Sequence, residues 1–176
     1  DDDNAEWANQ KSRPDIALSP SGILAVMRTD RIQGGDGFYS FVPWVEITDA
    51  TGRRRVELPE GLSDVLTIDL SSDGRQLAYA GATRDEFVAT MGVIDLETGT
   101  PIMQRALSRE AVAGEGLETG LYWVDKLAFV PGTTDLIVIG GEGGDIWQMD
   151  TAENRVTHVI GRRIAASQPL VMPGGN

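Results

Sequence analysis

The chemistry open to this chain is narrow, because it contains one histidine and no cysteine. A thiolate nucleophile, a disulfide and a Cys-ligated zinc are therefore excluded. A Ser-His-acid triad would depend on His158, which lies in an alternating run typical of an outer strand, and no Gly-x-Ser-x-Gly elbow accompanies it. Neither glycine-rich phosphate-binding motif is present. We therefore expect no catalytic residue.

Calcium is the one metal that the sequence suggests. The segment Gly140-Gly-Glu-Gly-Gly-Asp145 and the residues after it formally match a calcium-binding nonapeptide. Such sites need stacked tandem copies, and the sequence holds one, so we expect a glycine-rich turn between two strands here. The candidate metal ligands are Asp36 and Asp145. No other cofactor is expected.

Aromatic side chains next to polar loops are the candidates for partner binding. The two longest polar stretches are residues 30–40 and 108–123. Loops held by a rigid scaffold commonly carry recognition, so we expect partner contacts from Phe38, Tyr39, Tyr122 and Trp123. Tyr79 and Trp147 instead lie inside strand-like apolar runs, and we expect them in the core.

Composition excludes several classes of function. Hydrophobic residues make up 41% of the 176 residues and charged residues 24%, which is typical of a globular domain. The net charge of −12 argues against nucleic acid and favours a basic protein partner. No apolar run approaches the ~18 residues of a membrane span, so a soluble protein is expected. The lack of cysteine fits either a reducing or an oxidising compartment, such as the cytoplasm or the periplasm.

The elements that position these residues are repeated. Similar turns between apolar runs begin at Ser19, Ser71, Val130 and Met172, about 52, 59 and 42 residues apart. A period in this range indicates a repeat architecture. Each full unit holds four candidate strands, and no helix is expected. The expected divisions are an acidic tail or donated strand (1–13), three units (14–60, 64–108 and 121–162), a loop (108–120) and the first strand of a further unit (167–176).

Two motifs of this repeat resemble those of the WD-repeat and related bacterial β-propeller families. The first is the turn after the first strand, Ser19-Pro-Ser-Gly22 and Ser71-Ser-Asp-Gly74. The second is the end of the third strand, where Ile-Thr-Asp49, Val-Ile-Asp95 and Gln-Met-Asp150 stand in place of Trp-Asp. The resemblance implies an all-β fold of four-stranded antiparallel blades. Three and a half blades make half a ring, because propellers typically have four to eight.

We therefore expect a non-catalytic protein-interaction or scaffold module, part of a larger bacterial propeller or multidomain protein and present as a fragment. Its partner would be a complementary propeller half or another protein, with a homo-oligomer as the alternative, and the isolated chain should self-associate. A different class of function stays open. Half of a propeller enzyme, resembling a lactonase or a quinone-dependent dehydrogenase, could hold calcium or a cofactor on the central axis. Its contributors would be Asp30, Asp36, Asp69 or Asp125.

Overall fold

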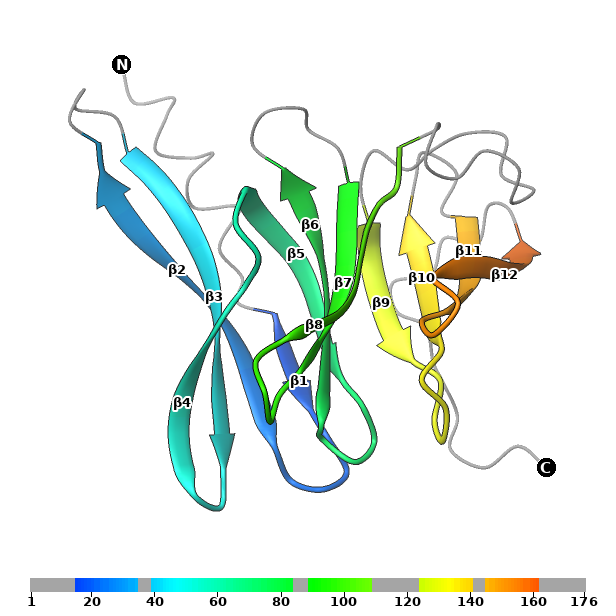
Figure 1. Cartoon of the computed structure of the whole chain (residues 1–176), viewed down its shortest axis with the longest axis horizontal. Coiled ribbons are helices and arrows are strands. Elements are labelled where there is room, and N and C mark those ends of the chain that lie inside the picture. Colours follow the sequence, from blue (N-terminus) through cyan, green and yellow to red (C-terminus); the bar gives the residue numbers. More distant parts are fainter. Residues whose placement is uncertain (1–14, 35–38, 84–88, 109–123, 141–144, 162–176) are drawn as a thin grey trace.

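The computed structural model describes residues 15–34, 39–83, 89–108, 124–140 and 145–161. These residues form twelve β-strands in three four-stranded antiparallel sheets, with no helix among them. Each sheet is a meander in which consecutive strands pair, and Figure 1 shows the three sheets side by side. The all-β class and the four-stranded units predicted from sequence are therefore confirmed. Within the described residues, no helix could cross a membrane.

The strand bounds follow the repeat. The first sheet contains β1 (Ile16–Leu18), β2 (Leu24–Gln33), β3 (Tyr39–Asp49) and β4 (Gly52–Glu57). The second contains β5 (Leu62–Leu70), β6 (Gln76–Thr83), β7 (Ala89–Asp95) and β8 (Pro101–Ala106). The third contains β9 (Val124–Phe129), β10 (Leu136–Gly140), β11 (Asp145–Asp150) and β12 (Arg155–Gly161). The predicted segments 1–13 and 167–176, and nearly all of the loop 108–120, lie outside the described residues.

The turn between the first and second strands places a glycine at an equivalent point in each sheet. In the first two sheets a buried serine hydroxyl accepts the backbone N–H at the far side of the turn, from Ile23 to Ser19 at 3.0 Å and from Gln76 to Ser71 at 2.9 Å. Each turn also needs a left-handed backbone, which glycine adopts without steric cost. The glycines with this conformation are Gly22, Gly74 and Gly132.

An aspartate organises the turn between the third and fourth strands. The Oδ1 atoms of Asp49, Asp95 and Asp150 each accept the N–H two residues onward, at 2.7, 2.9 and 2.9 Å. Bonds to the Thr51 hydroxyl and N–H lower the pKa of Asp49, and bonds from Thr98 lower that of Asp95. This local capping explains why the repeat keeps an aspartate where the third strand ends.

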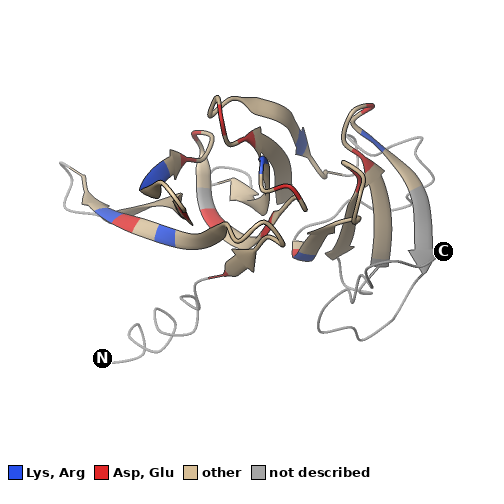
Figure 2. Ribbon diagram, turned by 90° about the horizontal axis from the view of Figure 1, so that it is seen from below, with Lys and Arg blue, Asp and Glu red and all other residues tan. Residues whose placement is uncertain are grey.

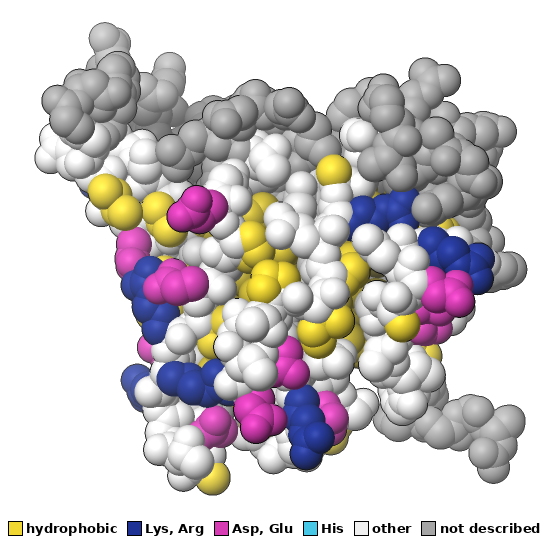
Figure 3. Space-filling model, in the orientation of Figure 1, with side chains coloured by type: hydrophobic (Ala, Val, Ile, Leu, Met, Phe, Trp, Pro, Cys, Tyr) yellow, Lys and Arg dark blue, Asp and Glu magenta, His cyan; other side chains and the backbone are white. Residues whose placement is uncertain are grey.

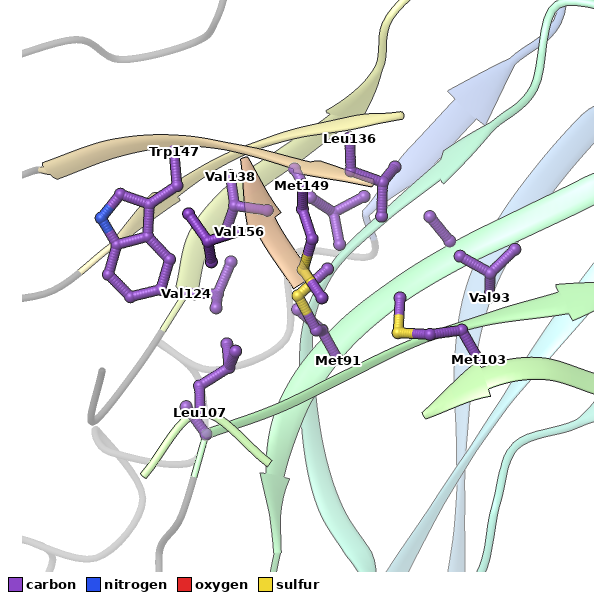
Figure 4. Close-up of a cluster of buried hydrophobic side chains, with 14 of the residues drawn as sticks. Met91, Val93, Met103, Leu107, Val124, Leu136, Val138, Trp147, Met149 and Val156 are labelled. Carbon is purple, nitrogen blue, oxygen red and sulfur yellow. The ribbon is translucent and has the colours of Figure 1, made fainter. Parts of the chain in front are cut away.

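Two apolar cores hold the sheets together. Between the first and second sheets lie side chains from both, including Val45, Ile47 and Leu77. Between the second and third lie Met91, Trp147 and their neighbours, drawn in Figure 4. Tyr79 and Trp147 are 0% and 1% exposed, which confirms their prediction as core residues. The first and second sheets therefore each contribute one face to the junction that follows them along the chain.

Tyr79 occupies space that a side chain at Gly92 would need. The two residues are cross-strand partners in β6 and β7. A Cβ added at Gly92 would lie 2.7 Å from Cε1 of the Tyr79 ring and closer still to the hydroxyl. Burial raises the pKa of Tyr79, and its hydroxyl has no hydrogen-bond partner among the described residues. Glycine at this position therefore makes room for the ring.

One predicted loop is shorter than expected. The stretch 30–40 is a long hairpin, since β2 and β3 stay paired from Leu24↔Thr48 out to Gln33↔Tyr39. Asp30 therefore lies within β2, in register with Val42, and not in a loop. The side chains of both strands alternate between the two faces of the sheet, as in regular β-structure. The described pairing ends at Gln33↔Tyr39, and residues 35–38 lie outside the described residues.

The first strands of the three sheets lie innermost. β5 contacts both β1 and β9, so the sheets fan from these strands (Figure 2). The described residues make an incomplete ring of three sheets. The outer side of the first sheet is therefore not covered by another described sheet.

Candidate functional site

The innermost strands enclose a polar recess of about 180 Å³. Three side chains there stand at one repeat position, four residues before the turn: Asp15, Thr67 and Lys126. Asp69 also lines the recess. The recess lies where a propeller would place its central axis, so we call it the axial recess.

Both carboxylate oxygens of Asp15 are engaged. Lys126 Nζ lies 3.1 Å from Asp15 Oδ1, and the backbone N–H of Ile68 donates to Oδ2 at 2.8 Å. The Asp15 side chain is 18% exposed and the Lys126 side chain 30% exposed, so the ion pair is only partly screened by solvent. Asp15 thus ties the first sheet to the second and, through Lys126, to the third.

Asp69 repeats this tie one sheet onward. Its Oδ2 accepts the backbone N–H of Phe129 at 2.8 Å, across the junction of the second and third sheets. Burial raises the pKa of Asp69, while bonds from the N–H groups of Phe129 and Leu70 oppose that rise and the charge of Asp15 adds to it. Burial of the Asp69 carboxylate therefore costs free energy, and the hydrogen bond across the junction offsets part of that cost.

The recess also contains one polar group without a partner. Thr67 is 1% exposed, and its Oγ1 makes no hydrogen bond within the described part of the chain. A buried hydroxyl in this state costs about 1–3 kcal/mol, which a ligand or an ordered water could recover. The recess can therefore offer a hydroxyl, carboxylate oxygens and an ammonium group to a small polar molecule.

A second candidate site is the uncovered side of the first sheet, which we call the outward face. Its inner strands are apolar, with Ile16 and Leu18 58% and 69% exposed. Strand alternation and pairing place the following residues on this face: Ile16, Leu18, Leu24, Val26, Arg28, Asp30, Trp44, Glu46, Thr48, Arg53, Arg55 and Glu57. The face is thus apolar toward the axis and charged toward the periphery.

The charged half of the outward face is internally paired. Asp30 accepts bonds from Trp44 Nε1 at 2.9 Å and from Arg55 Nη1 at 2.6 Å, and these bonds lower its pKa. Arg55 also pairs with Glu57, and its guanidinium lies 4.5 Å from the Trp44 ring centroid. Figure 3 shows charges of both signs intermixed on the side where β2–β4 lie. The network fixes side chains that would otherwise be free to move.

The residues predicted from sequence are only partly brought together. Tyr39 is 47% exposed, with the Arg31 guanidinium 3.4 Å from its ring centroid, and Phe41 beside it is 51% exposed. Phe38, Tyr122, Trp123 and Asp36 lie outside the described residues, as do the side chains of Asp145 and His158. Their predicted roles stay predictions.

Three of the four axial candidates fall in the described strands. Only Asp69 lines the recess; Asp30 lies in the outward-face network and Asp125 is exposed in β9. No group of three or more His, Asp or Glu side chains suited to a metal occurs among the described residues. Asp15, Thr67 and Lys126 were not predicted as site residues, although aligning the units on their turns places all three at one position.

Many solved structures have a similar fold, whereas comparison of the sequence with known families and curated proteins finds no match. No protein-family model and no curated protein matches the chain. Similar solved structures include the β-propeller domain of the Trilobed protease from Pyrococcus furiosus, with a TM-score of 0.57, 18% identity and coverage of 86% of this chain and 42% of that one. The mitotic checkpoint complex matches with a TM-score of 0.50, 15% identity and coverage of 87% and 37%.

A luciferin-regenerating enzyme matches with a TM-score of 0.51, 16% identity and coverage of 90% and 48%. The chain thus spans less than half the length of each of these structures. At such low identity the likeness shows the fold alone. The chain has a β-propeller fold of four-stranded antiparallel blades, and the described ring is incomplete.

Proposed function

We propose that the chain is a non-catalytic protein-interaction or scaffold module, part of a larger propeller or multidomain protein, and that its outward face receives the partner. The observation that carries this is a contrast between equivalent positions. Ile68 and Leu70 are each 4% exposed where the first blade covers them, whereas Ile16 and Leu18 are more than half exposed. Full burial of one such side chain contributes about 1.5–3 kcal/mol, so a cover here would be favourable.

The axial carboxylates support the same reading. Asp15 and Asp69 each accept a backbone N–H from the following blade, which is a structural use of a carboxylate. The long β2–β3 hairpin adds a second contact surface, with Tyr39 and Phe41 exposed near its end. A protein partner fits both surfaces. We place this activity in a bacterial protein, as the repeat style suggests.

The test compares two exposed apolar surfaces. The variant Ile16→Asp/Leu18→Asp charges the outward face, and Ile102→Asp charges another exposed apolar site, on β8, where Ile102 is 45% exposed. Each protein is immobilised and exposed to an extract of the source organism, after circular dichroism has shown an intact β fold. The expected result is a protein retained by the wild type and Ile102→Asp but not by the outward-face variant. Equal retention by all three would contradict the proposal.

The axial recess supports a second candidate, half of a propeller enzyme resembling a lactonase or a quinone-dependent dehydrogenase, with calcium or a cofactor on the axis. The observation in its favour is the unpartnered hydroxyl of Thr67 beside Asp69. Calorimetric titration with Ca²⁺ tests it, with Asp69→Asn as the comparison. Stoichiometric binding that this variant loses would favour the enzyme, and an equal response of both proteins would count against it.

A further inference from the structure

The two junctions between blades use the same three kinds of contact, although the carboxylate and the arginine each stand two repeat positions apart in the two blades. These contacts define what a blade needs in order to pack against its successor. The first contact is a carboxylate on the innermost strand. Asp15 accepts the N–H of Ile68 in the second blade, and Asp69 accepts the N–H of Phe129 in the third, both at 2.8 Å. A charge-assisted bond of this kind is stronger than one between neutral groups, so it marks a specific contact.

The second contact is an arginine on the outermost strand. Arg54 of β4 donates from Nη1 to the carbonyl of Leu96 at 2.7 Å, and Arg105 of β8 donates to the carbonyl of Asn154 at 2.8 Å. Both carbonyls belong to the turn between the third and fourth strands of the next blade. Inner and outer edges of each junction are therefore fixed by side chains from the preceding blade.

The third contact is a small side chain on the second strand. In register with the inner strand, Ala25 pairs with Ala17 in the first blade and Ala78 with Asp69 in the second. Both alanines are fully buried and belong to the cores between blades. A small side chain here lets the next blade pack close to the second strand.

The outward face carries the receiving half of this set. Ile16 and Leu18 stand where Ile68 and Leu70 stand in the second blade. Two hydrogen bonds show which backbone groups beside β1 point toward β2. The N–H of Met27 donates to the C=O of Asp15, and the N–H of Ser19 donates to the C=O of Ile23. Because the direction alternates along a strand, the N–H groups of Ile16 and Leu18 point away from β2, toward the axis. The turn from Asp49 to Gly52 stands where an incoming arginine would bond.

The third blade lacks two of the three donor contacts, the carboxylate and the small side chain. Lys126 stands at the repeat position of Asp15, and Ala128 at that of Asp69. Ile137, in register with Ala128, occupies the place of Ala25 and Ala78. This blade therefore offers an ammonium group instead of a carboxylate and a large side chain instead of a small one. A second copy of this chain is a poor match to the outward face.

The periphery of the outward face sets a further requirement. Thr48 is in register with Leu24, whereas the corresponding third-strand residues are Ile94 in the second blade and Met149 in the third. Glu46 likewise stands where Trp147 stands in the third blade. The partner's outer strands must therefore be polar, because burying Glu46 and Arg28 against apolar groups would be costly.

We propose that the outward face receives a propeller blade other than the three described here, and that this blade carries the donor set. Its innermost strand supplies a carboxylate to the N–H of Ile16 or Leu18. Its second strand presents an alanine to these two side chains, and an arginine of its fourth strand bonds a carbonyl of the turn from Asp49 to Gly52. Its outer strands are polar toward the face. This inference rests on the proposed function and specifies its partner.

The proposal is tested by giving two of the three donor contacts, the carboxylate and the small side chain, to a second copy of the whole chain. Ala128→Asp restores the carboxylate and Ile137→Ala the small side chain on the third blade. The expected result is self-association at least about 10-fold tighter than that of the unchanged chain, equivalent to about 1.4 kcal/mol, by sedimentation equilibrium. Adding Ile16→Asp/Leu18→Asp should abolish the gain, and Ala128→Lys/Ile137→Ala should not produce it.

Two results would overturn the proposal. One is an association constant of the donor variant within about twofold of the unchanged chain; the other is a gain that survives the charged outward face. If the double variant fails to fold, Ala128→Asp alone should give a smaller gain of the same sign, and no gain would again count against the blade. This result is separate from a failure of the proposed function. That failure would appear as retention of the partner protein by the Ile16→Asp/Leu18→Asp variant.

Discussion

The carboxylate of Asp69 accepts the backbone N–H of Phe129 at 2.8 Å and so joins two blades near the centre of the fan. Asp15 joins the preceding pair through Ile68 at the same distance. Each bond satisfies an N–H on the free edge of an innermost strand, where the strand has no further neighbour. These carboxylates take the place of a sheet partner at the axis.

Removing the Asp69 carboxylate should weaken the junction of the second and third blades. Asp69→Ala leaves the Phe129 N–H without its acceptor, and we expect a loss of about 1–3 kcal/mol in the free energy of unfolding. Asp69→Asn keeps an acceptor and should cost less. Urea denaturation followed by tryptophan fluorescence measures both. Equal stability of Asp69→Ala and the wild type would show that the bond is dispensable.

The same carboxyl should leave a signature in the pH dependence of stability. Burial holds the folded-state pKa of Asp69 above 3.8, so the proton is bound more tightly in the folded chain. The stabilisation that this tighter proton binding adds is therefore complete below pH about 4 and is lost as pH rises through the folded pKa. Relative to Asp69→Asn, the wild type should be more stable at pH 4 than at pH 7. A constant difference between the two proteins would contradict the raised pKa.

Gly92 should not tolerate a side chain. In Gly92→Ala the new methyl group meets the Tyr79 ring, which the core holds in place, so we expect a loss of about 1–3 kcal/mol. Tyr79→Phe removes the hydroxyl, which has no partner among the described residues, and should be close to neutral on its own. The double variant should recover part of the loss in thermal denaturation. A double variant no better than Gly92→Ala would mean that the Tyr79 hydroxyl is not the obstacle.

The two junction arginines should differ in importance. Arg105 is 8% exposed, whereas the side chain of Arg54 is 41% exposed. A charge-assisted bond in a buried setting is less screened, so Arg105→Met should cost about 1–3 kcal/mol. Arg54→Met should cost less than about 1 kcal/mol. Chemical denaturation of the two variants checks the order, and a larger loss for Arg54→Met would reverse it.

The repeat could be predicted from sequence because its turns are local. The Ser-x-x-Gly and Asp-x-x-x-Gly segments set their own backbone, so strands and sheet size follow from short stretches. Tyr79 and Trp147 were assignable to the core from their apolar neighbours. The pairing out to Gln33↔Tyr39 was not, since polar hairpin strands resemble a loop in sequence.

The sites depend on contacts between distant segments, and this is why they were harder to predict. Asp15 reaches a backbone group in another blade, and nothing near it in sequence reveals that partner. Ile16 and Leu18 form the same apolar pattern as Ile68 and Leu70, so their exposure could not be read from the sequence. Ile16 and Leu18 are exposed because no other described blade packs against the outer side of the first blade.

The central claim is that the outward face of the first blade is an interface. The chain has no cysteine, so Leu18→Cys introduces a single thiol on this face, and Ile102→Cys places a control thiol on β8. Alkylation rates are measured for the chain alone and in complex with the partner that it retains. We expect fast labelling of both thiols in the free chain, and in the complex at least about 10-fold slower labelling of Leu18→Cys only. Unchanged labelling of Leu18→Cys in the complex would contradict the claim.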